Sequence, residues 1–258
     1  MPVSYSSYLQ VDALLELQKP LSDGPEHDEH LFIVVHQVYE LWFKQILHEL
    51  TLVQTALHER ELPTAQKTLR RILTILKTMV GQIDVIETMS PLSFGSFRGR
   101  LESASGFQSA QFRQLELVLG HRSASRLAHL DEATRARLEP ILQKPSVYDS
   151  FLRYLAGSGY EIPSSILTRN LAEPPVADPG VQKALLVIYK TDPASANLCE
   201  LMVDLDEGLQ EWRYRHVKMV ERTIGFKTGT GGSSGAEYLR RTLFAPVFPD
   251  LWAVRADL

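Results

Sequence analysis

Two of the eight histidines lie on apolar faces of predicted helices, where an imidazole could bind a metal or a cofactor. His216 shares a helical repeat with apolar neighbours, namely Leu209, Trp212, Met219, Val220 and Thr223. His36 lies in LFIVVHQVYELW, four residues after Phe32 and on the same helical face. For either histidine taken alone, a core imidazole bonded to a carbonyl or carboxylate is the commoner explanation.

The other histidines are weaker candidates for chemistry. His27 and His30 flank acidic residues at a predicted helix start, which is typical of solvated side chains, and His58, His121 and His129 are predicted to lie at the surface. A glycine-rich stretch, KTGTGGSSG, follows the His216 helix directly. Its glycines can adopt positive φ and bring several backbone N–H groups close to a ligand.

Most familiar catalytic motifs are missing from this sequence. It contains no HExxH, no Cys/His cluster, no repeated Glu-x-x-His pair and no GxSxG, and the glycine-rich stretch is neither a Walker A loop nor a dinucleotide fingerprint. The single cysteine, Cys199, excludes an internal disulfide, a CxxC pair and covalent haem attachment through CxxCH. The possibility that remains is a non-covalently bound haem. One imidazole would be its axial ligand, a second imidazole would lie on the opposite side, and the polar loop would contact a small molecule.

The elements that must position these residues are predicted to be helices. Long apolar repeats without Pro or Gly predict a helix over 26–59, and a second long helix begins at Pro63 and ends before Ser90-Pro91, so that the two form an antiparallel pair. Further helices are predicted at 107–119, 131–143, 146–156, 180–190, 196–224 and 234–244. Residues 1–20 form an arm, the piece after Pro91 is short and irregular, and 157–179 is a surface excursion. We therefore expect an all-α, single-domain helical bundle.

Composition restricts the partners and the location. The 258 residues are 44% hydrophobic, enough for a sizeable core, and the net charge of −4 with no basic block argues against nucleic acid as a partner. No apolar run is long enough to span a bilayer, and the first ten residues do not resemble a signal peptide, so that we expect no membrane association and a cytoplasmic location.

Three stretches resemble the signature regions of the tryptophan 2,3-dioxygenase family, in order and with similar separations: LFIVVHQVYELWFKQILHEL, FGSFRGRLESASGFQSAQFR and EWRYRHVKMVERTIGFKTGTGGSSG. The resemblance covers nearly the whole chain, from Tyr5 to about Phe248. It implies that residues 1–258 form one domain whose long antiparallel helices enclose haem b. It also implies a homotetramer, built as a dimer of dimers, in which the arm contacts a neighbouring subunit.

The resemblance assigns roles residue by residue. His216 matches the proximal ligand of the haem iron, and His36 with Phe32 matches residues beside the indole on the distal face. Arg98 and Thr230 match the residues that hold the carboxylate and the ammonium of the amino acid, and His36, Arg98 and Thr230 are the predicted catalytic residues. The remaining matches are Phe94 and Leu101 in the substrate pocket, Ser105 and Gly106 near the haem and the polar end of the substrate, and Tyr5, Tyr8 and Leu9 on the arm. The loop 226–236 is expected to be a mobile active-site loop.

The implied reaction inserts both atoms of O₂ into the indole C2=C3 bond of L-tryptophan and gives N-formylkynurenine, a step of tryptophan catabolism. Two positions depart from the family pattern: Gly99 follows Arg98 where aspartate is common, and Ser103 replaces a usual proline. They leave open a monooxygenase of the same fold that acts on a tryptophan analogue, such as a β-methyl-tryptophan, to give an oxindole or a hydroxyindoline. A non-catalytic haem-binding protein is a third alternative.

Overall fold

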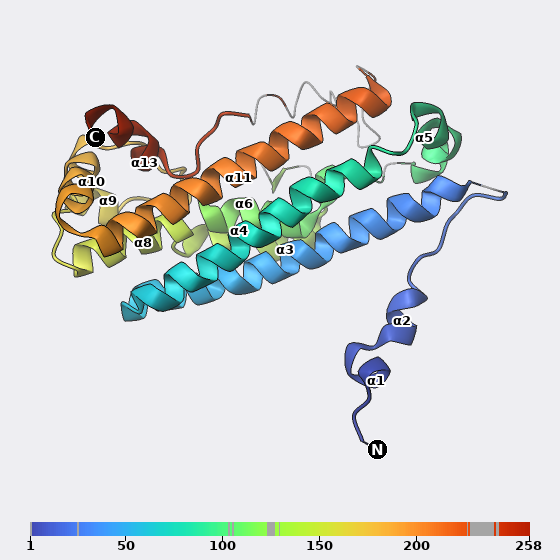
Figure 1. Ribbon diagram of the computed structural model, residues 1–258. Coiled ribbons are helices and arrows are strands. Elements are labelled where there is room, and N and C mark those ends of the chain that lie inside the picture. The colour runs from blue at the N-terminus through green and yellow to red at the C-terminus, as the bar shows by residue number, and fades with distance from the viewer. Residues whose placement is uncertain are drawn as a thin grey trace.

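Three long helices form the main layer of the molecule (Figure 1). The computed structural model describes residues 2–24, 26–102, 104, 106–122, 127–128, 130–225, 227, 240 and 243–258. Within them α3 (His27–Glu59), α4 (Leu62–Ile86) and α11 (Pro193–Ile224) lie side by side, with α4 in the middle. The described residues contain no β-strand, which confirms the predicted all-α fold.

Local chemistry explains how α3 and α4 form their antiparallel pair. Arg60, which ends α3, adopts the left-handed conformation with φ of 61°, and Pro63 occupies the first turn of α4, where no backbone N–H is needed. Along α4, buried side chains recur at three- and four-residue spacing: Ala65, Leu69, Ile72, Leu76, Met79, Val80 and Ile83. This face packs against both α3 and α11 and forms the centre of the main hydrophobic core.

Shorter helices complete the bundle. Their bounds are α5 (Pro91–Arg98), η1 (Gly99–Leu101), η2 (Gly106–Gln108), α6 (Ala110–Leu119), α7 (Glu132–Leu138), η4 (Glu139–Gln143), α8 (Val147–Gly157), α9 (Ser164–Leu167), α10 (Pro179–Thr191), α13 (Pro249–Ala253) and η5 (Val254–Asp257). The helices α6 and α8 pack on α3, whereas α10 and α13 pack near the start of α11. Ser146 caps α8 in a reciprocal capping box, as its position before that helix predicts.

Two predictions about the elements are wrong. The piece after Pro91 is not irregular, because Ser90 accepts a hydrogen bond from the Ser93 N–H and so begins α5. The helix predicted over 131–143 ends at Leu138 and continues as the 3₁₀ helix η4, in which Pro140 cannot donate a helical hydrogen bond. The helix predicted over 234–244 lies mainly outside the described residues and stays a prediction there; Arg240 is helical, and the turn at 243–244, where Phe244 has φ of 61°, follows it.

The N-terminal arm extends away from the bundle in Figure 1, as the helices α1 (Tyr5–Leu9) and α2 (Val11–Leu15), neither of which buries a residue. Its base is held against α3, where the buried carboxylate of Glu29 accepts hydrogen bonds from the backbone N–H groups of Leu21, at 2.7 Å, and Ser22, at 3.0 Å. Burial alone would raise the pKa of Glu29, but these bonds, a bond to the Ser22 side chain and the charge of Arg100 together lower it. The arm therefore leaves the body from a fixed point.

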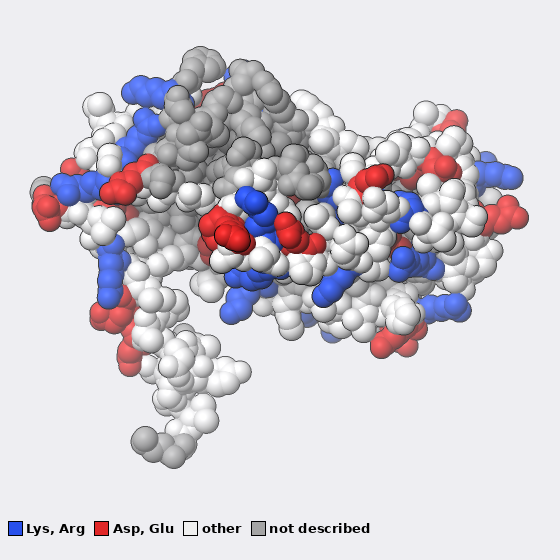
Figure 2. Space-filling model, turned by 180° about the vertical axis from the view of Figure 1, so that it is seen from behind, with Lys and Arg blue, Asp and Glu red and all other residues white. Residues whose placement is uncertain are grey.

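Figure 2 shows acidic and basic side chains interspersed over the back of the molecule. Among the described residues of that face we see no extended patch of one sign. No helix in the described part of the chain combines the length and the apolar character that crossing a membrane requires.

The buried carboxylate of Asp206 ties the C-terminal segment to α11. Its Oδ2 accepts hydrogen bonds from the backbone N–H groups of Val247, at 2.8 Å, and Phe248, at 3.0 Å, and from Trp252 Nε1 at 2.9 Å. Replacing Asp206 by alanine leaves these donors without their acceptor, so that we expect the free energy of unfolding to fall by about 3 kcal/mol in urea titrations. Asp204→Ala, an exposed aspartate on the same helix, is the control and should change it by less than about 0.5 kcal/mol. Equal losses in the two variants would contradict this role.

Candidate active site

The two predicted site histidines come from different long helices and lie close together. His36 is on the first half of α3 and His216 is on the last third of α11, separated by most of the sequence. Burial lowers the pKa of His216 to about 4, and the nearby His36 imidazole contributes to this shift. Both rings are therefore neutral near pH 7, which is the form of imidazole that binds metals.

Aromatic packing fixes the orientation of the His216 ring. Trp212, one turn earlier on α11, stacks on it with a centroid distance of 5.4 Å and an interplanar angle of 14°. The indole of Trp212 is itself held by Phe112 of α6 at 5.1 Å and by Phe43 of α3 at 6.0 Å. His216 makes no hydrogen bond to any residue that the structure describes and keeps part of its surface accessible. Neither ring nitrogen of His216 is therefore bonded to a residue that the structure describes.

A hydrogen bond defines the tautomer of His36. Its Nδ1 lies 2.7 Å from the backbone carbonyl oxygen of Phe32, one turn earlier on α3. A carbonyl can only accept, so that Nδ1 carries the proton and Nε2 keeps a lone pair. Burial lowers the pKa of His36 although this bond opposes the shift, which favours the neutral ring. His36 can therefore accept a hydrogen bond from a ligand through Nε2.

An apolar cluster beside His36 joins three elements that are distant in the sequence. Phe94 and Phe97 of α5 are buried against Phe32, with centroid distances of 5.8 and 5.6 Å, and the Phe32 ring lies 4.1 Å from that of His36. The other members of the cluster are Leu31, Met89, Leu101 and Ile224. The structure thus brings Phe32, Phe94 and Leu101 into one cluster beside His36.

Of the polar and glycine residues predicted for the site, the structure describes Arg98 and Gly106 but not Ser105 or Thr230. Arg98 is the last residue of α5 and is partly buried, directly after the cluster residue Phe97. Gly106 begins the 3₁₀ helix η2, and apart from its chain neighbours no atom of the described residues lies within 4 Å of the position that a Cβ would take there. Ser105, Thr230 and, apart from Lys227, the predicted loop 226–236 lie outside the described residues.

The arm residues Tyr5, Tyr8 and Leu9 do not join this site within the chain. They are 79%, 77% and 46% exposed and belong to the extension that leaves the bundle. Their assignment to a neighbouring subunit's pocket stays a prediction.

A network of buried charges next to the site does not follow from the sequence pattern. Glu116 of α6 accepts hydrogen bonds from Arg113 at 2.5 Å and from Arg213 of α11 at 2.9 Å. Arg213 also donates to Nε2 of His121 at 3.2 Å, because a guanidinium cannot accept. The prediction that His121 lies at the surface is wrong, since it is only 8% exposed. The spacing of Arg113 and Glu116 is also that of an ordinary surface ion pair, and nothing in the sequence distinguishes the two cases.

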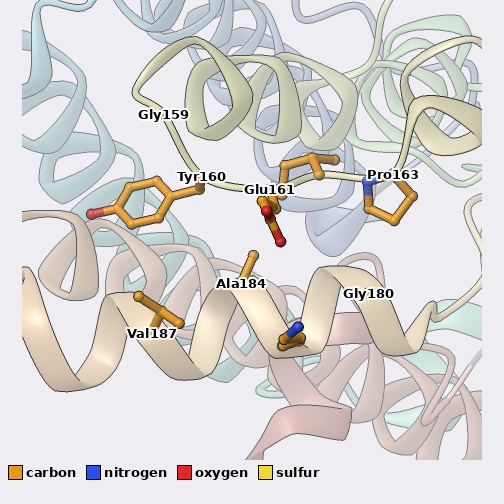
Figure 3. A pocket seen from close by; sticks show the side chains of 9 residues that line it. Gly159, Tyr160, Glu161, Pro163, Gly180, Ala184 and Val187 are labelled. Carbon is orange, nitrogen blue, oxygen red and sulfur yellow. The ribbon is translucent and has the colours of Figure 1, made fainter.

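A groove elsewhere on the molecule is separate from the histidines (Figure 3). It has a volume of about 470 Å³ and lies between the segment Gly159–Pro163 and α10, where Lys183, Ala184 and Val187 line it. In Figure 1, α10 and α5 lie at opposite ends of the bundle, so that this groove is not part of the site around His36. Among the described residues, no group of three or more His, Cys, Asp or Glu side chains could hold a metal ion by itself.

Comparison with known proteins identifies the family. The tryptophan 2,3-dioxygenase family profile matches residues 1–143 and 176–258. The chain belongs to the tryptophan 2,3-dioxygenase family. A tryptophan 2,3-dioxygenase of Herpetosiphon aurantiacus is 59% identical over 257 residues, which cover 99% of this chain and 98% of the relative. Those of Anaeromyxobacter dehalogenans and Kineococcus radiotolerans are 58% and 44% identical, each over 99% of this chain and over 96% and 91% of the relatives.

Membership of the tryptophan 2,3-dioxygenase family confirms the resemblance that the three sequence stretches carry, and it makes the chain a member of an oxidoreductase family. Relatives of this name match at up to 59% identity over nearly the full chain, which favours the dioxygenase interpretation over the monooxygenase alternative.

Proposed function

We propose that this chain is a haem-dependent tryptophan 2,3-dioxygenase that converts L-tryptophan and O₂ into N-formylkynurenine. The observation that carries the proposal is that two neutral imidazoles, those of His36 and His216, lie near each other beside the apolar cluster of α3 and α5. Residues 1–258 would act as one domain in the cytoplasm, as a homotetramer built as a dimer of dimers, with tryptophan catabolism as the pathway.

The residues around His216 fit a haem. The imidazole is neutral, makes no hydrogen bond to any described residue and is oriented by Trp212, so that a ring nitrogen would be available to hold the haem iron. Gly106 is assigned to the neighbourhood of the haem on the resemblance, and the described residues leave the space beside its Cα open. When bound, haem b supplies the iron that activates O₂ for the reaction. Ser105 is assigned to the same region on the resemblance alone.

His36 would orient the indole. Its Nδ1 proton is engaged by the Phe32 carbonyl, so that Nε2 is left as an acceptor that would take a hydrogen bond from the indole N–H. The indole N–H is a very weak acid, and the role of His36 is therefore orientation and not proton removal. Phe32, Phe94 and Leu101 would enclose the ring and exclude water from it.

Arg98 and Thr230 would hold the polar end of the amino acid. A guanidinium presents two parallel N–H donors that match a carboxylate, and Arg98 lies at the end of α5 beside the pocket that receives the indole. Thr230 is proposed as the contact of the ammonium and carboxylate groups on the resemblance. Tyr5, Tyr8 and Leu9, which are exposed on the arm, would complete the pocket of another subunit.

The mass of the product tests this function. Reduced, haem-loaded protein incubated aerobically with L-tryptophan is expected to give a product that is heavier by two oxygen atoms, and both atoms should carry the label when ¹⁸O₂ is used. Parallel incubations with methylated tryptophans serve as the comparison. A product with one added oxygen atom would establish the monooxygenase alternative. If no indole amino acid changed the haem absorption spectrum, the non-catalytic alternative would be correct.

A further inference from the structure

The helix α6 contacts both histidine-bearing helices, each about one turn from its histidine. On α3, Glu40 lies four residues after His36, and Gln111 Nε2 of α6 donates to its carbonyl oxygen at 2.9 Å and to its carboxylate at 2.8 Å. On α11, Arg213 lies three residues before His216 and donates to the Glu116 carboxylate of α6. Residues three or four apart on a helix are neighbours, so that each contact fixes the turn that carries the imidazole.

Aromatic packing supports the same two contacts. Phe112 of α6 lies 5.4 Å from Phe43 of α3 and 5.1 Å from Trp212 of α11, measured between ring centroids. Trp212 in turn stacks on His216. A short segment of α6 thus contacts the surroundings of both histidines, in addition to the direct ring contact between Phe43 of α3 and Trp212 of α11 and to α4, which lies between α3 and α11 (Figure 1).

The contact of α6 with α11 is buried, so that its geometry is strictly held. Glu116 and Arg213 are 2% and 4% exposed, and Arg113 and His121 of the same network are also buried. A buried ion pair holds its geometry strictly, because displacement of either partner leaves an uncompensated charge in a medium of low dielectric constant. Gln111, by contrast, is only partly buried and can be changed without leaving a buried charge.

We propose that α6 is a brace that sets the distance and orientation between His36 and His216, with Gln111 and Glu116 as its positioning residues. The inference rests on the proposed function in one respect, the assignment of His216 as the iron ligand. Glu116 acts through Arg213 on the His216 side, and Gln111 acts through Glu40 on the His36 side. Substitution of Glu116 should therefore change the iron spectra and haem retention, whereas substitution of Gln111 should change the binding of tryptophan.

Glu116→Gln tests the His216 side. The amide keeps the shape of the side chain but removes the charge that Arg113 and Arg213 share. We expect the haem-loaded variant, without substrate, to show an altered absorption and electron paramagnetic resonance spectrum of the iron, and to lose haem to an acceptor protein about tenfold more readily than the wild type.

Glu49→Gln is the matched control. Like Glu116, Glu49 is a buried helical glutamate bonded to an arginine; its partners are Arg71 at 2.8 Å and Gln45 at 2.6 Å. It lies 13 residues beyond His36 on α3, or about 20 Å along the helix. This variant should lose stability, as Glu116→Gln does, while its iron spectra and haem retention match the wild type.

Gln111→Met tests the His36 side with a side chain of similar length. The substrate-free spectra should match the wild type, whereas the spectral change on titration with L-tryptophan should require about three- to tenfold more substrate, with kcat less affected than KM, because the two hydrogen bonds from Gln111 to Glu40 orient His36 without touching the substrate.

The outcomes separate the brace from a purely structural role. If Glu116→Gln and Glu49→Gln destabilise equally and both keep wild-type iron spectra, the brace is wrong on the His216 side. If Glu116→Gln does not fold, Gln111→Met decides, and an unchanged tryptophan titration overturns the inference. A His216→Ala protein with the wild-type haem spectrum would overturn the proposed function itself, and the brace with it.

Discussion

Replacing His216 by alanine is expected to give a folded protein that no longer retains haem and has no detectable dioxygenase activity. The imidazole is the only part of the side chain that can ligate iron, and it makes no hydrogen bond to any described residue whose loss would unfold the protein. The free energy of unfolding of the haem-free protein should therefore change by only about 1–2 kcal/mol. Haem content per chain, from the Soret absorbance, and helical circular dichroism are the two measurements.

The control for this prediction is His36→Ala, which removes an imidazole from the other side of the site. That variant should keep its haem and instead bind L-tryptophan more weakly, because His36 is proposed to contact the indole and not the iron. Free imidazole added to His216→Ala should restore haem binding, since it can occupy the space that the side chain leaves. A His216→Ala protein that retains haem with an unchanged Soret band would show that the ligand is another residue.

The sequence predicts the long helices well because their patterns are long. More than thirty residues without Pro or Gly leave few alternatives to α3, and the apolar spacing of α4 corresponds to a single buried face. On α3 the individual side chains are less certain, since α4 packs on one side and α6 and α8 on others. Leu41, which fits the apolar spacing, is 51% exposed, whereas Phe43 is buried. A helix with several partners has a wide apolar face, and its periodicity does not define one stripe.

The helix α5 shows where local signals fail. Ser90-Pro91 ends the preceding helical pattern and is also a favourable start for the next helix, and the sequence alone does not separate the two meanings. The eight residues contain Gly95 and two serines, so that their intrinsic helix propensity is low. Burial of Phe94 and Phe97 against Phe32 stabilises the helix instead, and these contacts join residues about 60 positions apart.

In the candidate site, too, some features can be predicted from the sequence and others depend on tertiary packing. The apolar faces that carry His36 and His216 are visible in the sequence, but the proximity of two residues 180 positions apart depends on how α3 and α11 both pack on α4. The buried network of Arg113, Glu116 and Arg213 could not be predicted, because charged residues are exposed in most proteins and only the tertiary structure supplies their partners.

Replacing Arg98 is expected to cause the largest loss of substrate affinity in the pocket. Each charge-assisted hydrogen bond to a carboxylate contributes about 1.5–3 kcal/mol, so that Arg98→Ala should lower kcat/KM for L-tryptophan by roughly 10- to 150-fold, or more when both bonds are lost. Arg98→Lys keeps the charge but not the parallel pair of donors, and most of the loss should persist. The control is Arg100→Lys, two residues later, whose side chain is 43% exposed and lies 3.5 Å from Asp23. That variant should stay within about twofold of the wild type, because exposed ion pairs contribute little.

A substrate without the carboxylate shows whether Arg98 acts on that group. Tryptamine keeps the indole and the amine of tryptophan but has no carboxylate for a guanidinium to bind. If Arg98 holds the carboxylate, the wild type should bind tryptamine far more weakly than tryptophan, while Arg98→Ala should bind the two about equally. Because Arg98 directly follows the buried Phe97, its loss could also disturb the apolar cluster. In that case Arg98→Ala would weaken tryptamine binding as much as tryptophan binding, and the carboxylate assignment would be wrong.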